Sequence, residues 1–198
     1  MTAPPQRAPA GPAALVAYAS RYGSTTEVAE AIGRTLGEAE RQVDVRHVDE
    51  VDDIADYGLV VLGGPIRYDR WMPGAVGFVR RHRGQLATSP TAFFFTCLAM
   101  SKPGARATRA ADRYEHAIRA IAPEIEPQAV GRFAGVLDYA RMPPLNRAVV
   151  RALLTLRGAE AGDHRDWGRI TSWARDLASS DLADASESER QKLRIRPI

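Results

Sequence analysis

Cysteine and histidine are scarce in this sequence. Its 198 residues include one cysteine, Cys97, and four histidines. A single cysteine excludes an intramolecular disulfide and a cysteine-cluster metal site, and it fits a reducing compartment. The histidines are scattered without the ligand spacing of zinc sites, so we expect no bound metal.

Long apolar runs and a large net charge are also absent. No stretch of about eighteen apolar residues occurs, and the N-terminus lacks the apolar region of a secretory signal, so we expect a cytoplasmic protein without a membrane-spanning helix. The formal net charge is only +3, which suits anionic ligands or an anionic membrane surface but does not indicate nucleic-acid binding. Hydrophobic residues make up 45% of the chain, enough for a sizeable core.

Strand-like and helix-like segments alternate between two polar ends. We expect a disordered lead-in at 1–12, one domain at 13–179, and a polar tail at 180–198 with room for a short helix. The expected strands are 14–19, 43–48, 59–62, 91–98 and 129–137, and the expected helices are 25–36, 73–83, 107–121 and 166–178. This alternation predicts an α/β fold, a doubly wound five-stranded parallel sheet with helices on both faces.

Parallel sheets bind ligands beyond the carboxyl ends of their strands, and the first such loop, 20–26, is rich in hydroxyl groups. It precedes a helix, whose N–H groups and dipole favour an anion, and Gly23 allows close backbone approach. The loop has neither the Walker pattern nor G-x-G-x-x-G. The alternative is a capping box, in which Ser24 and Glu27 cap the helix without a ligand.

The next two loops suit a flat ring. Two glycines and a proline at 63–65 predict a rigid turn, after which Tyr68 can stack on a ring, with Trp71 close enough to help. The alternative is an ordinary turn with Tyr68 covering the core. The loop at 96–101 is small and neutral, like a floor or a plain strand end, and we interpret Cys97 as a buried small hydrophobe. Together the three loops fit a mononucleotide with a flat ring system.

These residues resemble the flavodoxin family. Ser20, Gly23 and Thr25 match its T-x-T-G-x-T phosphate loop, and Tyr22 departs from it. Three further stretches, 61–68, 134–139 and 162–167, resemble the branch of the family that includes menaquinone-dependent protoporphyrinogen IX dehydrogenase. The resemblance covers about residues 14–178.

The resemblance implies a flavodoxin-like fold and a non-covalent FMN. Its phosphate would be held by Ser20, Arg21, Tyr22, Gly23, Ser24 and Thr25. Its isoalloxazine would be flanked by Pro65, Ile66, Arg67 and Tyr68 on one side and by Thr96, Cys97, Leu98 and Ala99 on the other. The third loop has no aromatic residue, which would leave the flavin open to a flat substrate. Arg21 would either add a charge to the site or point away, and no catalytic residue is identified.

The resemblance also implies a function in heme biosynthesis. FMN would take electrons from a flat reduced substrate and pass them to a quinone or another acceptor. The alternatives are a flavodoxin-type electron carrier, a NAD(P)H:quinone reductase, and a flavin-free relative in which the first loop is only a helix cap. Carriers of this kind tend to be strongly acidic, so the net charge of +3 speaks against the first alternative.

A long connection at 139–162 forms an insert before the last helix. Its basic amphipathic stretch at 141–158 predicts peripheral contact with the inner face of a membrane, or a helix packed on the domain or in a homodimer interface. Just beyond it, His164 invites a catalytic role. We favour the simpler interpretation that Asp163 or Asp166 supplies an N-terminal charge or cap to the following helix.

Overall fold

In the described residues, the main path of the sheet is five parallel strands in the order β2-β1-β3-β5-β6, and a sixth strand pairs off this path. The computed structural model describes residues 13–39, 42–138 and 161–194, and its side chains as far as residue 180. The strands are β1 (Ala14–Tyr18), β2 (Val43–His47), β3 (Leu59–Arg67), β5 (Thr91–Cys97) and β6 (Ala129–Ala134). The expected doubly wound α/β fold is therefore confirmed.

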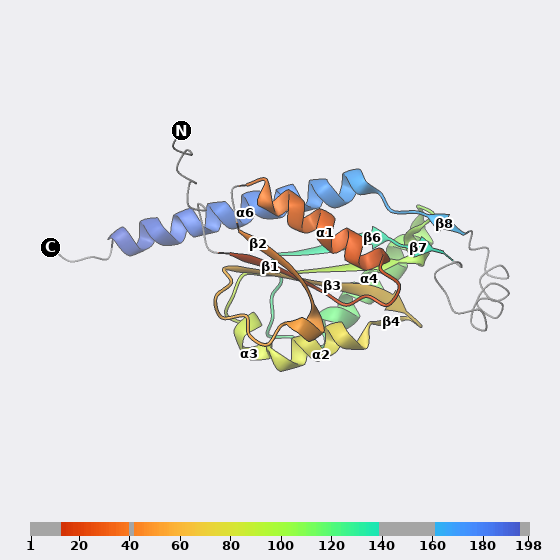
Figure 1. Cartoon of the computed structure of the whole chain (residues 1–198), viewed down its shortest axis with the longest axis horizontal. Coiled ribbons are helices and arrows are strands. Elements are labelled where there is room, and N and C mark those ends of the chain that lie inside the picture. Colours follow the sequence, from red (N-terminus) through yellow and green to blue (C-terminus); the bar gives the residue numbers. More distant parts are fainter. Residues whose placement is uncertain (1–12, 40–41, 139–160, 195–198) are drawn as a thin grey trace, which may run out of the picture.

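Helices cover both faces of the sheet (Figure 1). One face carries α1 (Ser24–Gly37) and α6 (Trp167–Arg194), and the other carries α2 (Pro73–Arg81), α3 (Arg83–Leu86) and α4 (Ala105–Arg119). Two short 3-10 helices, η1 (Val48–Glu50) and η2 (Leu98–Met100), follow β2 and β5. None of the helices in the described ranges is long and apolar enough to cross a membrane.

Strand β5 shows why the sheet has two cores. All seven of its residues are buried. Because side chains alternate between the faces of a strand, Phe93 and Phe95 join the core beneath α2 and α4, whereas Phe94 joins the core beneath α1 and α6. An apolar run of this kind is what a strand covered on both faces requires.

Strand β3 is longer than the sequence pattern predicts. The turn expected at 63–65 is wrong, because these residues continue the strand and the turn lies at Tyr68 and Asp69, whose φ angles are 50° and 58°. The chain then returns as β4 (Arg70–Trp71), antiparallel to β3. Gly63 serves packing, since a Cβ added there would overlap the ring of Phe94.

The strand expected at 129–137 is divided in two. It breaks at Gly135, after which β7 (Val136–Leu137) pairs in antiparallel fashion with β8 (Gly162–Asp163). This small ribbon returns the chain to the sheet after the insert. The basic stretch predicted at 141–158 lies outside the described residues, as does the lead-in at 1–12.

The last helix begins as expected and ends later. The Asp166 carboxylate accepts a hydrogen bond from the N–H of Arg169 at 2.9 Å, so the cap interpretation is confirmed for Asp166. Ile170, Ala174 and Leu177 are buried against the sheet. The helix continues to Arg194, through most of the segment assigned to a polar tail, and it projects past the sheet in Figure 1.

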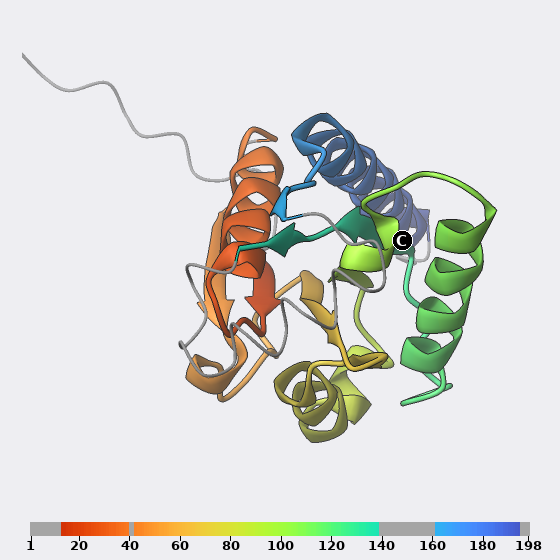
Figure 2. The ribbon, with the colours of Figure 1, turned by 90° about the vertical axis from the view of Figure 1, so that its right-hand side faces the viewer.

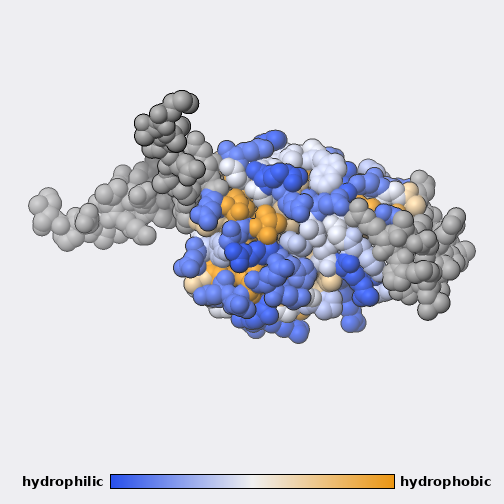
Figure 3. Space-filling view, viewed as in Figure 1, coloured by the Kyte–Doolittle hydropathy of each residue, from blue (hydrophilic) through white to orange (hydrophobic). Residues whose placement is uncertain are grey.

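Apolar surface is limited on the face shown in Figure 3, where the largest orange area lies over the region of β2. A shallow groove of about 390 Å³ lies between α1 and β2, lined by Glu30, Gly33, Arg34, Gly37, Val43 and Val45. These residues belong to the later part of α1 and the start of β2, away from the carboxyl ends of the strands.

Candidate functional site

The three predicted loops meet at the carboxyl edge of the sheet, which faces the viewer in Figure 2. Tyr18, the last residue of β1, lies opposite Gly63 of β3, and Pro65 lies opposite Thr96 of β5. Strand β3 therefore runs past the end of β1. Its hairpin with β4 extends beyond the edge, beside the loop that leads into α1.

The start of α1 has the features that favour an anion. Its N-cap is Gly23, in the left-handed conformation (φ 84°, ψ −18°), and no side chain caps the helix. The capping box is therefore wrong, since Ser24 is already helical. The first-turn N–H groups have no intrahelical acceptor, and the helix dipole adds positive potential there. Ser20 steadies the loop by accepting a hydrogen bond from the N–H of Gly23 at 3.1 Å.

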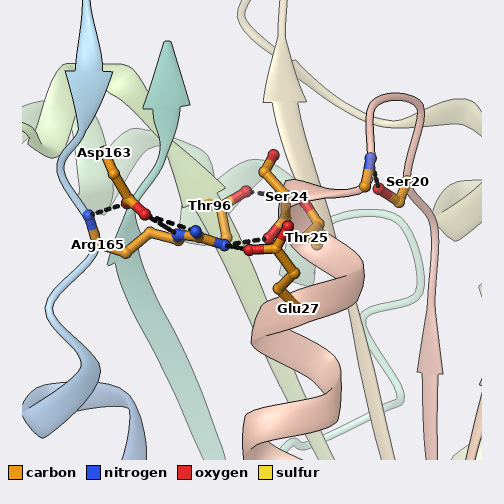
Figure 4. Close-up of polar contacts among 8 residues, drawn as sticks. Ser20, Ser24, Thr25, Glu27, Thr96, Asp163 and Arg165 are labelled. Atoms are coloured by element: carbon orange, nitrogen blue, oxygen red, sulfur yellow. Dashed lines mark hydrogen bonds and ion pairs between the residues drawn. The ribbon is translucent and has the colours of Figure 1, made fainter. Parts of the chain in front are cut away.

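Thr25 and Thr96 connect the first and third predicted loops (Figure 4). Their hydroxyl oxygens lie 3.1 Å apart, and either can donate. Both side chains are buried, Thr25 with 1% of its surface exposed and Thr96 with 4%. Two residues predicted to hold different parts of one ligand are thus in direct contact, and this contact fixes the start of α1 against the end of β5.

Arg165 is a site residue that sequence reasoning missed. Its side chain is only 6% exposed, and its guanidinium lies 2.8 Å from the Glu27 carboxylate and 2.5 Å from that of Asp163. It also donates to the carbonyl oxygen of Ser24 at 3.0 Å (Figure 4). No local sequence pattern reveals these contacts, because the segment after the insert meets α1 only in the folded chain.

The electrostatic effect of Arg165 is to neutralise the first turn of α1. Burial lowers the pKa of Arg165, but hydrogen bonds with Asp163 and Glu27 outweigh burial and raise it, so the guanidinium stays charged. The hydrogen bond from Arg165 lowers the pKa of Asp163 more than partial burial raises it. Glu27 alone would repel an anion at this helix end, and its ion pair with Arg165 offsets that repulsion.

Cation–aromatic contacts join the first and second loops. The guanidinium carbon of Arg67 lies 5.1 Å from the ring centre of Tyr22 and 5.7 Å from that of Tyr68. Arg21 lies 5.9 Å from the same Tyr22 ring. Tyr68 is 87% exposed, so the alternative in which it covers the core is wrong, and its stacking on a ligand stays a prediction.

Trp71 does not help to form a ring platform, contrary to expectation. It is 5% exposed and packs edge-on against Phe93. Its indole N–H donates to the carbonyl oxygen of Gly64 at 3.2 Å. Trp71 therefore ties the hairpin to the core, while Pro65 and Ile66 are half-buried within β3.

The third loop, residues 96–101, has no charged side chain. Cys97 ends β5 and is buried, and burial raises the pKa of its thiol, which agrees with the interpretation of Cys97 as a small hydrophobe. Leu98 is half-buried and Ala99 exposed, both in η2. The roles of these residues in binding a flavin stay predictions.

A hydrogen-bond network between α4 and the turn at Asp69 holds the hairpin in place. The hydroxyl of Tyr114, on α4, donates to the Asp69 carboxylate at 2.5 Å, and Arg113 donates to the same oxygen at 3.2 Å. Burial, followed by the hydrogen bond with Asp69, raises the pKa of Tyr114 to about 12. Asp69 sits at the turn, so α4 anchors the tip of the hairpin.

Some known proteins are similar to this chain in sequence, and others are similar in fold. A protoporphyrinogen IX dehydrogenase (quinone) from Leishmania major is 28% identical over 180 residues, which cover 87% of this chain and 77% of that protein. The protein of the same name from Escherichia coli K12 is 27% identical over 171 residues, covering 83% and 93%. A flavodoxin from the Archaea superposes with a TM-score of 0.53 at 14% identity, over 86% of this chain and 99% of that one.

The family model described as a flavodoxin domain matches residues 15–162. The residues at the carboxyl edge fit the cofactor of that family, since an uncapped helix start flanked by the hydroxyls of Ser20 and Ser24 suits a phosphate. The loop at 98–101 contains no aromatic side chain. This chain belongs to the flavodoxin-domain family, and its cofactor is FMN.

Proposed function

We propose that this protein is an FMN-dependent oxidoreductase that takes electrons from a porphyrinogen or a similarly flat reduced substrate and delivers them to a quinone. The observation that carries the proposal is the similarity, over more than four-fifths of the chain, to proteins named protoporphyrinogen IX dehydrogenase (quinone). The absence of an aromatic side chain in the loop at 98–101 supports it, because one face of a bound ring is left to the substrate.

When bound, the flavin supplies the redox chemistry, and the protein positions it. The first turn of α1 and the hydroxyls of Ser20 and Ser24 bind the phosphate, with Arg165 offsetting the charge of Glu27. The β3–β4 hairpin and the segment 96–99 flank the ring. The Asp69–Tyr114 hydrogen bond holds the hairpin against α4.

Reconstitution followed by assay tests this function. Purified protein is titrated with FMN, whose fluorescence is quenched on binding, and the loaded protein is mixed anaerobically with protoporphyrinogen IX and a menaquinone analogue. We expect formation of fluorescent protoporphyrin that requires both FMN and the quinone, and protein without FMN is the control. FMN-loaded protein that oxidises no porphyrinogen with any quinone would contradict the proposal.

The two redox alternatives give different results in the same preparation. Steady-state oxidation of NADPH with a quinone would indicate a NAD(P)H:quinone reductase. Fast one-electron exchange with a ferredoxin reductase, without porphyrinogen oxidation, would indicate an electron carrier. The porphyrinogen reaction is expected to be faster than either.

A cytoplasmic location with contact at the inner membrane face through 141–158, or a homodimer through the same stretch, stays a prediction. Flotation with vesicles containing anionic lipid tests the first, with Arg147→Gln/Arg151→Gln as the variant that should bind less. Sedimentation equilibrium tests the second. A monomer that does not float would overturn both.

A further inference from the structure

The β3–β4 hairpin forms a wall beside the flavin site. Tyr18 at the end of β1 pairs with Gly63, and β3 continues through residues 64–67, about 13 Å at the usual rise of a strand. At the tip of the wall, Ile66 pairs with Trp71 and Arg67 pairs with Arg70. The wall thus ends in two arginines placed directly opposite each other.

These two arginines lie on the same face of the hairpin. Directly paired residues of an antiparallel ladder share a face, and like charges there are destabilising. Ile66 and Trp71 contact the core beneath α2 and α4, so alternation along the strand turns Arg67 and Arg70 toward the other side. This is the side where Arg67 stands over Tyr22.

Neither arginine is neutralised within the described part of the chain. Arg67 contacts the rings of Tyr22 and Tyr68 there and has no carboxylate partner, and Arg70 is exposed and has no ion pair. The one nearby carboxylate in the turn, Asp69, is bound by Tyr114 and Arg113 of α4. The repulsion between Arg67 and Arg70 is therefore left for a bound anion to relieve.

The surroundings preorganise the pair. Asp69 anchors the turn to α4, and the ring of Tyr22 holds the guanidinium of Arg67 while leaving its charge intact. Arg21 adds a third guanidinium, 5.9 Å from the centre of the same Tyr22 ring. A cation held in place before binding loses less entropy when a ligand arrives.

We propose that Arg67 and Arg70, assisted by Arg21, bind the carboxylate groups of the flat substrate and orient it over the flavin. This inference rests on the proposed function, and it identifies how the substrate is recognised: porphyrinogens carry carboxylates at the rim of a large ring. Guanidinium groups bind carboxylates through paired, charge-assisted hydrogen bonds. The FMN phosphate is the competing oxyanion, but the start of α1 already provides its donors, and the arginine pair is on another element.

The test compares an acid with its ester. Steady-state kinetics of FMN-loaded protein are measured with protoporphyrinogen IX and with its dimethyl ester, in the same detergent. Arg67→Gln and Arg70→Gln should each raise KM for the acid by about tenfold, because a charge-assisted hydrogen bond is lost. Both variants should leave KM for the ester unchanged, and Arg70→Gln, which lies outside the residues expected to flank the flavin ring, should also leave FMN affinity unchanged. Arg34→Gln, at the opposite end of α1, removes the same charge and should change nothing.

A binding experiment with the reaction product tests this inference independently of the proposed function. Titration of FMN-loaded protein with protoporphyrin IX and its dimethyl ester needs no turnover, and the same acid-specific loss is expected there. Equal effects on acid and ester, or no effect of either variant, would overturn the inference even if the wild type is active. The inference would also be overturned if a variant lost FMN affinity but kept riboflavin affinity. Riboflavin lacks the phosphate, so that result would show that Arg67 and Arg70 bind the phosphate of FMN.

Discussion

The guanidinium of Arg165 lies 2.8 Å from the carboxylate of Glu27, so the segment after the insert neutralises an acidic side chain in the first turn of α1. The N-terminal end of that helix, where we propose that the phosphate binds, is therefore completed by a residue from the far end of the domain (Figure 4). This contact gives the first prediction.

Arg165→Met should weaken FMN binding specifically. The unpaired Glu27 would repel the phosphate, and we expect the Kd for FMN to rise about tenfold while that for riboflavin, which lacks phosphate, is unchanged. Fluorescence titrations with both flavins measure the ratio. In the double variant Arg165→Met/Glu27→Gln the repelling charge is also removed, so most of the FMN affinity should return. If Arg165→Met has the same ratio of FMN Kd to riboflavin Kd as the wild type, Arg165 is not involved.

Thr25 and Thr96 should be energetically coupled. Thr25→Val or Thr96→Val leaves the other buried hydroxyl without its partner, and each should lower the free energy of unfolding by about 1–2 kcal/mol. The double variant should lose clearly less than the sum of the two. Urea denaturation of the four proteins measures this coupling, and strictly additive losses would mean that the hydrogen bond contributes little.

Gly63→Ala should destabilise the sheet. Its Cβ would overlap the ring of Phe94, and overpacking of a buried strand costs about 1–3 kcal/mol. Gly77→Ala, on α2 with no atom near the added Cβ, is the matched control and should gain about 0.5–1 kcal/mol. Combining Gly63→Ala with Phe94→Leu should cost less than the two changes added; a Gly63→Ala protein as stable as the wild type would refute the packing role.

Tyr114 should ionise only at strongly alkaline pH. Its pKa is raised from 10.0 to about 12, because burial and the hydrogen bond to Asp69 favour the protonated hydroxyl. A pKa that is higher in the folded state contributes stability that is complete below pH 10 and declines as pH rises toward about 12. Tyr114→Phe should remove the late phase of the ultraviolet tyrosine titration and flatten this decline, and an unchanged titration curve would contradict the assignment.

Local patterns correctly predicted the positions of the first and third loops, and their role in binding stays a prediction. The hydroxyl-rich loop at 20–26 lies at a helix start, and the strand ends at Tyr18 and Cys97 place the first and third loops on one edge. The second loop was misjudged. Glycine and proline are typical of turns, but here Gly63 allows close packing within the strand. The turn falls instead on Tyr68 and Asp69, between the paired strands β3 and β4.

The sequence by itself determined the elements and the fold class, because periodic apolar positions specify which face of each helix or strand is buried. It also placed hydroxyl groups and Gly23 at the start of a helix, where we propose that an anion binds. Only the tertiary structure decided the charge balance of the site. The contacts of Arg165 with Glu27 and of Arg67 with Tyr22 join segments far apart in the chain, which no local periodicity encodes.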